Sequence, residues 1–327
     1  MIVSPLALAL CYNITLMNDI DIEKLNRTYG APGRIVFKDG FAGCPNVVLA
    51  NKYGTAEVAL FGACVLSYRP TGHSNVIFRP AKKDAEYQPG ESFHGGIPLC
   101  WPQFGNRFDK SLPQHGFARK SLFKVRSTEY TEEKTEVVLS LTSDAKTLEA
   151  WPHVFDLEVV VSVTMKLNVT VRVKNTGESP FAFSCGLHPY FLLRERDRVT
   201  VRGLDKLGYI DASGDTLVEG VQEGDVALTK DYDHVFNLPQ GAVKSEFAIL
   251  DSGLGRAIAI AATGNTKAVV WNPGTAYVVG DHTAEDWRRF VCVEPVSDWP
   301  GGRTLEAGAE YVLALAVQCH LEEKKGS

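Results

Sequence analysis

The 327-residue sequence has no cysteine or histidine pairs at metal-binding spacing, since neither C-x-x-C nor H-x-x-x-H occurs. Its seven cysteines are odd in number and widely spread, which argues against a disulfide framework and predicts buried thiols in a reducing compartment. No P-loop, G-x-G-x-x-G or G-x-S-x-G motif is present. These absences argue against nucleotide cofactors and serine-hydrolase chemistry, and we expect no metal and no cofactor.

A long basic run is also missing. Lysine and arginine total 34 against 39 acidic residues, which gives a net charge of −5. Nucleic acid is therefore not an expected partner. A mildly acidic surface still permits anionic small molecules, because a pocket can be locally basic.

The first residues are apolar but lack the positive segment and the cleavage site of a signal peptide. Pro5 and Asn13 make this stretch a poor membrane span. We expect a flexible or strand-like leader over 1–30, one catalytic domain over 31–321 and a polar tail over 322–327. The expected location is the cytoplasm, without a membrane partner.

Short strands separated by Gly, Asn or Pro dominate the rest of the chain. The segment 168–175 alternates apolar Val with polar side chains, which predicts a half-buried antiparallel strand paired with 156–167. Helical signals are limited to 19–28 and 144–150, and 211–233 reads as a long connection. The sequence therefore predicts an all-β fold, a large antiparallel β-sandwich. Further strands are expected at 34–38, 46–50, 56–61, 64–69, 181–186, 198–203, 246–250, 256–262, 267–271, 289–295 and 310–318.

Two loops have unusual composition. HGGIPLCWPQFG (94–105) combines a Gly pair with two prolines, which indicates either a shaped binding loop or a structural turn around a packed Trp. LPQHGFAR (112–119) gathers Gln114, His115 and Arg119. Such groups suit hydroxyls and anions, although a surface turn with an ordinary salt-bridged Arg fits equally well.

Two titratable side chains lie in apolar surroundings. His188 stands in FSCGLHPYF, and a lone histidine there is either a core residue bonded to backbone or a functional group. Glu294 ends the apolar strand FVCVEP, where Cys292 and Glu294 alternate with Val291 and Val293. A carboxylate in this position either pairs with an arginine or has the raised pKa of a general base.

Taken together, these motifs resemble one family. HGGIPLCWPQFG, LPQHGFAR, a His followed by Tyr-Phe, D-x-V-F, WNP and C-x-E-P are similar, in this order, to the hexose-6-phosphate mutarotases. These form the glucose-6-phosphate 1-epimerase branch of the aldose 1-epimerase family, and the match extends over about residues 34–320. The resemblance implies the galactose-mutarotase-like fold in a single domain, and a monomer acting on a sugar or sugar phosphate.

The resemblance also implies roles for particular residues. His188 would be the general acid that protonates the ring oxygen, and Glu294 the base that takes the proton of the C1 hydroxyl. Both groups would need to titrate near neutral pH. Asp233 would bind sugar hydroxyls. Gln114, His115 and Arg119 would contact the substrate, with Arg119 on the phosphate.

One position departs from the family pattern. The family reads R-G-G-I-P where this sequence has His94, and a neutral imidazole is a poorer anion partner than a guanidinium. Arg79, Lys82 and Lys83 are nearby sources of positive charge. A mutarotase of unphosphorylated aldoses, a non-catalytic sugar-binding protein and a β-sandwich interaction module therefore remain as alternatives.

Overall fold

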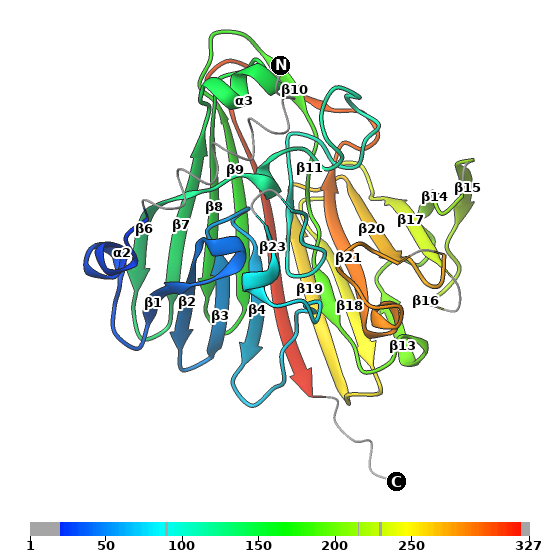
Figure 1. Cartoon of the computed structure of the whole chain (residues 1–327). Coiled ribbons are helices and arrows are strands. Elements are labelled where there is room, and N and C mark those ends of the chain that lie inside the picture. The colour runs from blue at the N-terminus through cyan, green and yellow to red at the C-terminus, as the bar shows by residue number, and fades with distance from the viewer. Residues whose placement is uncertain (1–19, 89–90, 215, 229–230, 277, 322–327) are drawn as a thin grey trace.

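The computed structural model describes residues 20–88, 91–214, 216–228, 231–276 and 278–321, and these form large antiparallel sheets (Figure 1). The all-β prediction is confirmed. One layer is a nine-stranded sheet. Its order is β16 (Val226–Ala227), β13 (Val199–Arg202), β18 (Ser245–Asp251), β19 (Arg256–Thr263), β23 (Glu310–Leu321), β9 (Leu167–Asn175), β8 (Phe155–Val163), β7 (Thr135–Thr142) and β6 (Lys124–Tyr130).

The facing layer consists of two further sheets. The eight-stranded sheet runs β15 (Val218–Val221), β14 (Gly208–Asp211), β17 (Tyr232–Asn237), β20 (Lys267–Asn272), β21 (Phe290–Ser297), β11 (Cys185–Leu187) and β5 (Leu99–Cys100), with β12 (Tyr190–Leu192) also on β21. The four-stranded sheet runs β1 (Ile35–Asp39), β2 (Pro45–Asn51), β3 (Gly54–Ala59) and β4 (Val65–Pro70). Strands β10 (Phe181–Phe183) and β22 (Arg303–Leu305) form a separate two-stranded sheet.

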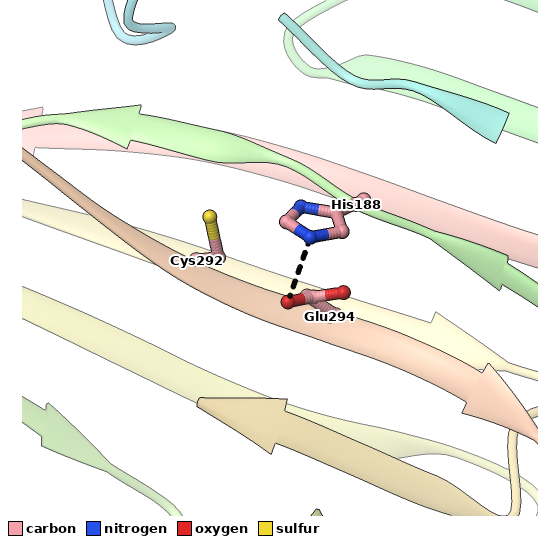
Figure 2. A group of neighbouring side chains, drawn as sticks. All are labelled: His188, Cys292 and Glu294. Atoms are coloured by element: carbon pink, nitrogen blue, oxygen red, sulfur yellow. Dashed lines mark ion pairs between the residues drawn. The ribbon is translucent and has the colours of Figure 1, made fainter. Parts of the chain in front are cut away.

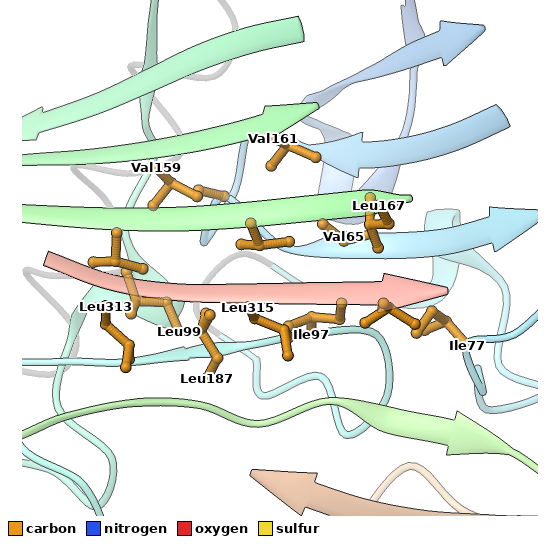
Figure 3. Close-up of a cluster of buried hydrophobic side chains, with 14 of the residues drawn as sticks. Val65, Ile77, Ile97, Leu99, Val159, Val161, Leu167, Leu187, Leu313 and Leu315 are labelled. Carbon is orange, nitrogen blue, oxygen red and sulfur yellow. The ribbon is translucent and has the colours of Figure 1, made fainter. Parts of the chain in front are cut away.

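The main core fills the space between these layers. Figure 3 shows Val159 and Val161 of β8 and Leu315 of β23 on one side, facing Leu99 of β5 and Leu187 of β11. Along β9 the valines are buried and the residues between them are more exposed, as the period of two requires. The inner strands of the large sheet thus present one apolar face to the core, against which the eight-stranded sheet packs.

Helices are few among the described residues, as the sequence predicts. They are α2 (Ile22–Tyr29) and α3 (Ala145–Ala150), with 3₁₀ turns at Phe41–Gly43, Asp84–Glu86, Ala118–Lys120, Arg196–Arg198 and Asp286–Arg289. Helix α2 begins at Asp21, whose carboxylate accepts from the Lys24 N–H at 2.9 Å. The Asn26 side chain bonds both backbone groups of Phe37, at 2.8 and 2.9 Å. The end of the expected leader therefore docks on β1, while residues 1–19 lie outside the described part.

Two expectations of the strand pattern need correction. The segment 211–233 is not one long connection, because β15 and β16 form within it. Neither strand shows an apolar alternation, because β15 is a mostly exposed edge strand and β16 has only two residues. The segment 181–186 divides into β10 and β11 at Ser184, which belongs to neither strand. The Ser184 hydroxyl oxygen accepts the Phe104 N–H.

The cysteine prediction is confirmed for the described thiols. Six are free and buried, namely Cys44, Cys64, Cys100, Cys185, Cys292 and Cys319. Cys11 lies outside the described residues. No helix in the described part of the chain is long and apolar enough to cross a membrane.

Candidate active site

A pocket of about 370 Å³ opens on the eight-stranded sheet. Strands β17, β20 and β21 supply its floor, and the loops at 94–107 and 114–119 supply its walls. All seven side chains singled out in the sequence line this pocket, which are His94, Gln114, His115, Arg119, His188, Asp233 and Glu294. The fold thus gathers in one place residues that are spread over the chain.

His188 stands between β11 and β12, where Pro189 interrupts the pairing with β21. Its backbone N–H donates to the Pro98 carbonyl at 3.0 Å, and the Tyr190 N–H donates to Gly96 at 2.9 Å. The 94–98 loop and the histidine are therefore fastened to each other through backbone. Gly96 has φ of +68°, and a Cβ there would lie 2.5 Å from the Val65 carbonyl, so the close approach requires glycine.

The histidine ring faces Glu294. Figure 2 shows the contact, in which His188 Nε2 lies 3.4 Å from Glu294 Oε1. His188 is 9% exposed and Glu294 is 1% exposed. The Tyr190 ring stacks on the imidazole at 4.8 Å with a 16° interplanar angle, which fixes its orientation. Among the described residues the carboxylate pairs with this histidine and not with an arginine, so the simple salt-bridge alternative is wrong.

The LPQHGFAR loop supplies the other polar wall. His115 Nδ1 accepts the Gly105 N–H at 3.2 Å, which leaves the ring proton on Nε2 as a donor. The Arg119 guanidinium donates to the Gln114 carbonyl at 2.9 Å, so a local bond replaces the salt bridge that an ordinary surface arginine would form. Gly116 has φ of +67°, and a Cβ would lie 2.1 Å from the Trp101 carbonyl. The loop is thus packed directly against the 94–105 segment.

Comparison with known proteins decides the family. The sequence profile described as aldose 1-epimerase matches residues 45–318. Proteins named "putative glucose-6-phosphate 1-epimerase" from Escherichia coli K12 and from Cenchrus ciliaris are each 30% identical, covering 76% and 80% of this chain and 81% and 80% of their own lengths. The chain belongs to the aldose 1-epimerase family.

Solved structures agree on the fold of this aldose 1-epimerase. A "putative mutarotase" from Salmonella typhimurium superposes with a TM-score of 0.79 at 25% identity, covering 94% of this chain and 99% of its own. A galactose mutarotase-like protein from Clostridium acetobutylicum gives 0.71 at 16% identity over 88% and 98% of the chains. The galactose-mutarotase-like fold is confirmed, and the chain is an isomerase, not an interaction module.

Burial sets the protonation of the epimerase's central pair. Desolvation, with a smaller effect from the Arg119 charge, lowers the pKa of His188 to about 3. Desolvation and the nearby Asp233 raise the pKa of Glu294 well above its ordinary value. Burial thus disfavours the charged form of both side chains. The lowered pKa of His188 departs from the expectation that it titrates near neutral pH, whereas the pKa of Glu294 is shifted in the direction expected of a buried general base.

Asp233 on β17 lies two strands from Glu294 on β21, with β20 between them. It is opposite Trp271 in the β17–β20 pairing, and Glu294 is opposite Val269 in the β20–β21 pairing. Burial and the Asp211 charge raise the pKa of Asp233 to about 6, against a lowering effect of Arg107. Asp233 acts on Glu294, Arg107 acts on Asp233 and the Arg119 charge acts on His188, so acidic and cationic side chains meet in the same pocket.

His94 is held by an aspartate that the sequence did not single out. His94 Nδ1 lies 2.6 Å from Asp281 Oδ1, and Asp281 also accepts the His94 N–H at 3.1 Å and the Tyr87 hydroxyl at 2.8 Å. Burial alone would raise the pKa of Asp281, but the hydrogen bond and charge of His94 hold it below its ordinary value. The pairing leaves Nε2 as the free ring nitrogen of His94.

The other cations near this loop do not reach the pocket. Arg79 pairs with Asp84, and Lys82 pairs with Glu91. Neither they nor Lys83 lines the pocket among the described residues. The suggestion that they supply positive charge to the site is therefore wrong, because each of the first two is engaged by an acid close in sequence.

Several pocket residues were missed by the sequence reasoning. Arg107 stacks over Trp299 at 6.0 Å, and both line the pocket together with Tyr190 and Trp271. Aromatic residues in a β-rich sequence usually belong to the core, so no local sequence feature indicated that these side chains line a pocket. The pairing of His94 with Asp281 left no signal either, because the two residues meet only in the fold.

Proposed function

We propose that this aldose 1-epimerase interconverts the α and β anomers of a hexose 6-phosphate, with glucose 6-phosphate as the first substrate to test. The observation that carries the proposal is a buried His188–Glu294 contact of 3.4 Å in a pocket that Arg107, Arg119 and Asp233 also line. The relatives named as glucose-6-phosphate 1-epimerases support the same substrate class.

The reaction needs one proton acceptor and one proton donor. In the ring-opening direction Glu294 takes the proton of the C1 hydroxyl while His188 protonates the ring oxygen, and the C1–O5 bond breaks. Rotation about the C1–C2 bond exposes the other face of the aldehyde. His188 then takes the C5 hydroxyl proton, Glu294 returns its proton to the carbonyl oxygen, and the ring closes with no net change in the enzyme.

The protonation of the free pair fits one half of this cycle. A protonated Glu294 beside a neutral His188 is the state that accompanies the open-chain aldehyde. Opening a cyclic sugar requires the proton on His188. A phosphate dianion beside Arg119 would favour the imidazolium, because an opposite charge nearby raises the pKa of a histidine. The substrate's own charge thus helps to place the proton for ring opening.

The charge distribution also suits the direction of the sugar. The ring oxygen is bonded to C5, which carries C6 and its phosphate, so the phosphate lies on the side of the acid. The positive charge of Arg119 acts on His188, and both side chains line the pocket. Asp233 would accept hydrogen bonds from sugar hydroxyls, and the Nε2–H of His115 would donate one.

A second candidate is a mutarotase of unphosphorylated aldoses. It is favoured by His94, because the Asp281 carboxylate at 2.6 Å offsets the positive charge that this side chain can offer. The pocket has the hydrogen-bonding groups for a free sugar in either case. Substrate preference is therefore the quantity to measure.

Magnetisation-transfer NMR of anomer exchange tests the proposal directly. Purified enzyme is compared with spontaneous exchange for glucose 6-phosphate, glucose and galactose at equal concentration. Faster exchange for the phosphate ester alone is the expected result. Faster exchange for the free sugars would replace it with the second candidate. No acceleration of any of them would contradict this substrate assignment.

Two statements about the working form of the enzyme belong with the proposal. We expect a monomer in the cytoplasm, and the six free buried thiols agree with a reducing environment. Light scattering after size exclusion measures the first, and cell fractionation measures the second. A stable dimer or a secreted protein would contradict them.

A further inference from the structure

We propose that His188, Cys292 and Glu294 form a zinc-binding site, and that zinc bound there blocks the epimerase. One nitrogen, one sulfur and one carboxylate oxygen of these residues lie within 4.8 Å of one another, and all three residues are buried. Figure 2 shows the thiol and the carboxylate rising from the same strand, next to the imidazole ring.

The fold explains this grouping. Cys292 and Glu294 are two residues apart on β21, so their side chains point to the same face of the sheet. Tyr190 of β12 pairs with Cys292, which brings the preceding His188 over this face. Acid–base chemistry accounts for the histidine and the glutamate, but it assigns no role to the cysteine.

The three groups match the ligand preferences of zinc. Zinc binds thiolate, imidazole and carboxylate at about 2.0–2.3 Å, usually in tetrahedral geometry. Tetrahedral ligands at such distances lie about 3.3–3.8 Å apart. The His188–Glu294 contact is already 3.4 Å, and all three ligand atoms lie within 4.8 Å of one another, so the cluster needs only a small contraction to hold an ion. His188 and Glu294 also line the pocket, which leaves the fourth position open to water.

Two further observations favour a cation. Glu294 Oε2 is buried and has no hydrogen-bond partner within the described part of the chain, and such an atom gains most from a ligand. One thiolate and one carboxylate balance the double charge of zinc, so the occupied site would be neutral, as a buried site requires. Binding would release the protons of the thiol and carboxyl groups to solvent. Arg119 and His94 oppose the ion electrostatically, while Asp233 favours it.

Inhibition, though not binding, rests on the function proposed above. A zinc ion held by Glu294 and His188 removes the base and the acid together, so anomer exchange should stop. Binding can be measured without any activity, which keeps the two questions apart.

The experiment titrates the full-length protein with zinc chloride against a chromogenic zinc chelator, in buffer freed of other chelators. We expect Cys292→Ala to weaken binding more than about tenfold, because a lost ligand costs at least as much as a lost supporting group. Cys185→Ala is the matched control, a buried thiol on the same sheet outside the cluster. It should bind zinc as the wild type does.

Cobalt provides a second readout that needs no variant. Wild-type protein loaded with cobalt chloride should gain the near-ultraviolet thiolate-to-metal absorption of a sulfur ligand. Absence of this band, or equal zinc affinity in folded Cys292→Ala and wild type, would overturn the site. Zinc binding that depends on Cys292 but leaves exchange unaffected would uphold the site and contradict the roles given to His188 and Glu294.

Discussion

The carboxylate of Asp281 holds the ring of His94 at the wall of the pocket, with 2.6 Å between Oδ1 and Nδ1. The aspartate side chain is 2% exposed and that of the histidine is 26% exposed. Asp281 is thus a buried anchor, and His94 is the part that a ligand can reach. The pair stands where the family has an arginine.

Removal of the His94 ring should weaken binding of the phosphate group. We expect His94→Ala to raise KM for glucose 6-phosphate about ten- to a hundredfold, the worth of one charged hydrogen bond, with kcat little changed. Steady-state exchange rates measure both constants. His320→Ala, an exposed histidine on β23, is the control. Equal losses for glucose and glucose 6-phosphate would show that His94 does not contact the phosphate.

The acid–base pair should be essential for turnover but not for folding. His188→Ala and Glu294→Gln are each expected to reduce the exchange rate about 10²–10⁴-fold, the usual contribution of a general acid or base. Circular dichroism and thermal melting check that the fold survives. A folded variant with nearly wild-type exchange would exclude that residue from the mechanism.

Asp233 should lower stability at neutral pH. Its pKa is raised to about 6 in the folded protein, above the ordinary 3.8, so the stabilisation by its protonated form is lost as pH rises through about 6. Asp233→Asn should therefore stabilise the fold at pH 8 by at most about 3 kcal/mol, and hardly at pH 4. Urea unfolding at both pH values measures this gain, which should accompany a higher KM.

The matched control for this change is Asp39→Asn, at the exposed end of β1. It should alter stability little at either pH. If Asp233→Asn destabilises the protein at pH 8, the carboxylate has a structural partner that outweighs its desolvation.

The glycine after His115 should be irreplaceable for steric reasons. Gly116 and Gly72 both have positive φ, at +67° and +80°, but only Gly116 has a backbone oxygen in the way of a Cβ. We expect Gly72→Ala to cost about 1–2 kcal/mol and Gly116→Ala clearly more, because the loop must move. Denaturant unfolding gives both values. Equal costs would show that the loop yields without strain.

The sequence predicted several strands whose apolar residues alternate, but it missed β7 and β17 inside the sheets as well as β6 and β15 at sheet edges. β8 and β9 were recognised because one face of each is buried. β6 is an edge strand with mostly exposed polar residues, so its pattern resembles a loop. Pairing with a neighbour, which no local pattern records, determines such strands.

The candidate site was found through motifs, and its internal contacts were not. The alternation in FVCVEP correctly placed Cys292 and Glu294 on one face. No feature of the sequence indicated that His188 would lie over that face, or that Asp281 would hold His94. Burial also lowered the pKa of His188 far below the expected range, and no local pattern predicts such a shift because desolvation depends on packing from every side.

The backbone bonds from His188 to Pro98 and from Tyr190 to Gly96 give the side chain at position 94 an unusual freedom to vary. These bonds involve no side chain, so the backbone of this loop keeps its position whichever residue stands at 94. On the proposed function, we expect a substitution at position 94 to alter the preference for phosphorylated sugars without displacing the backbone that carries His188.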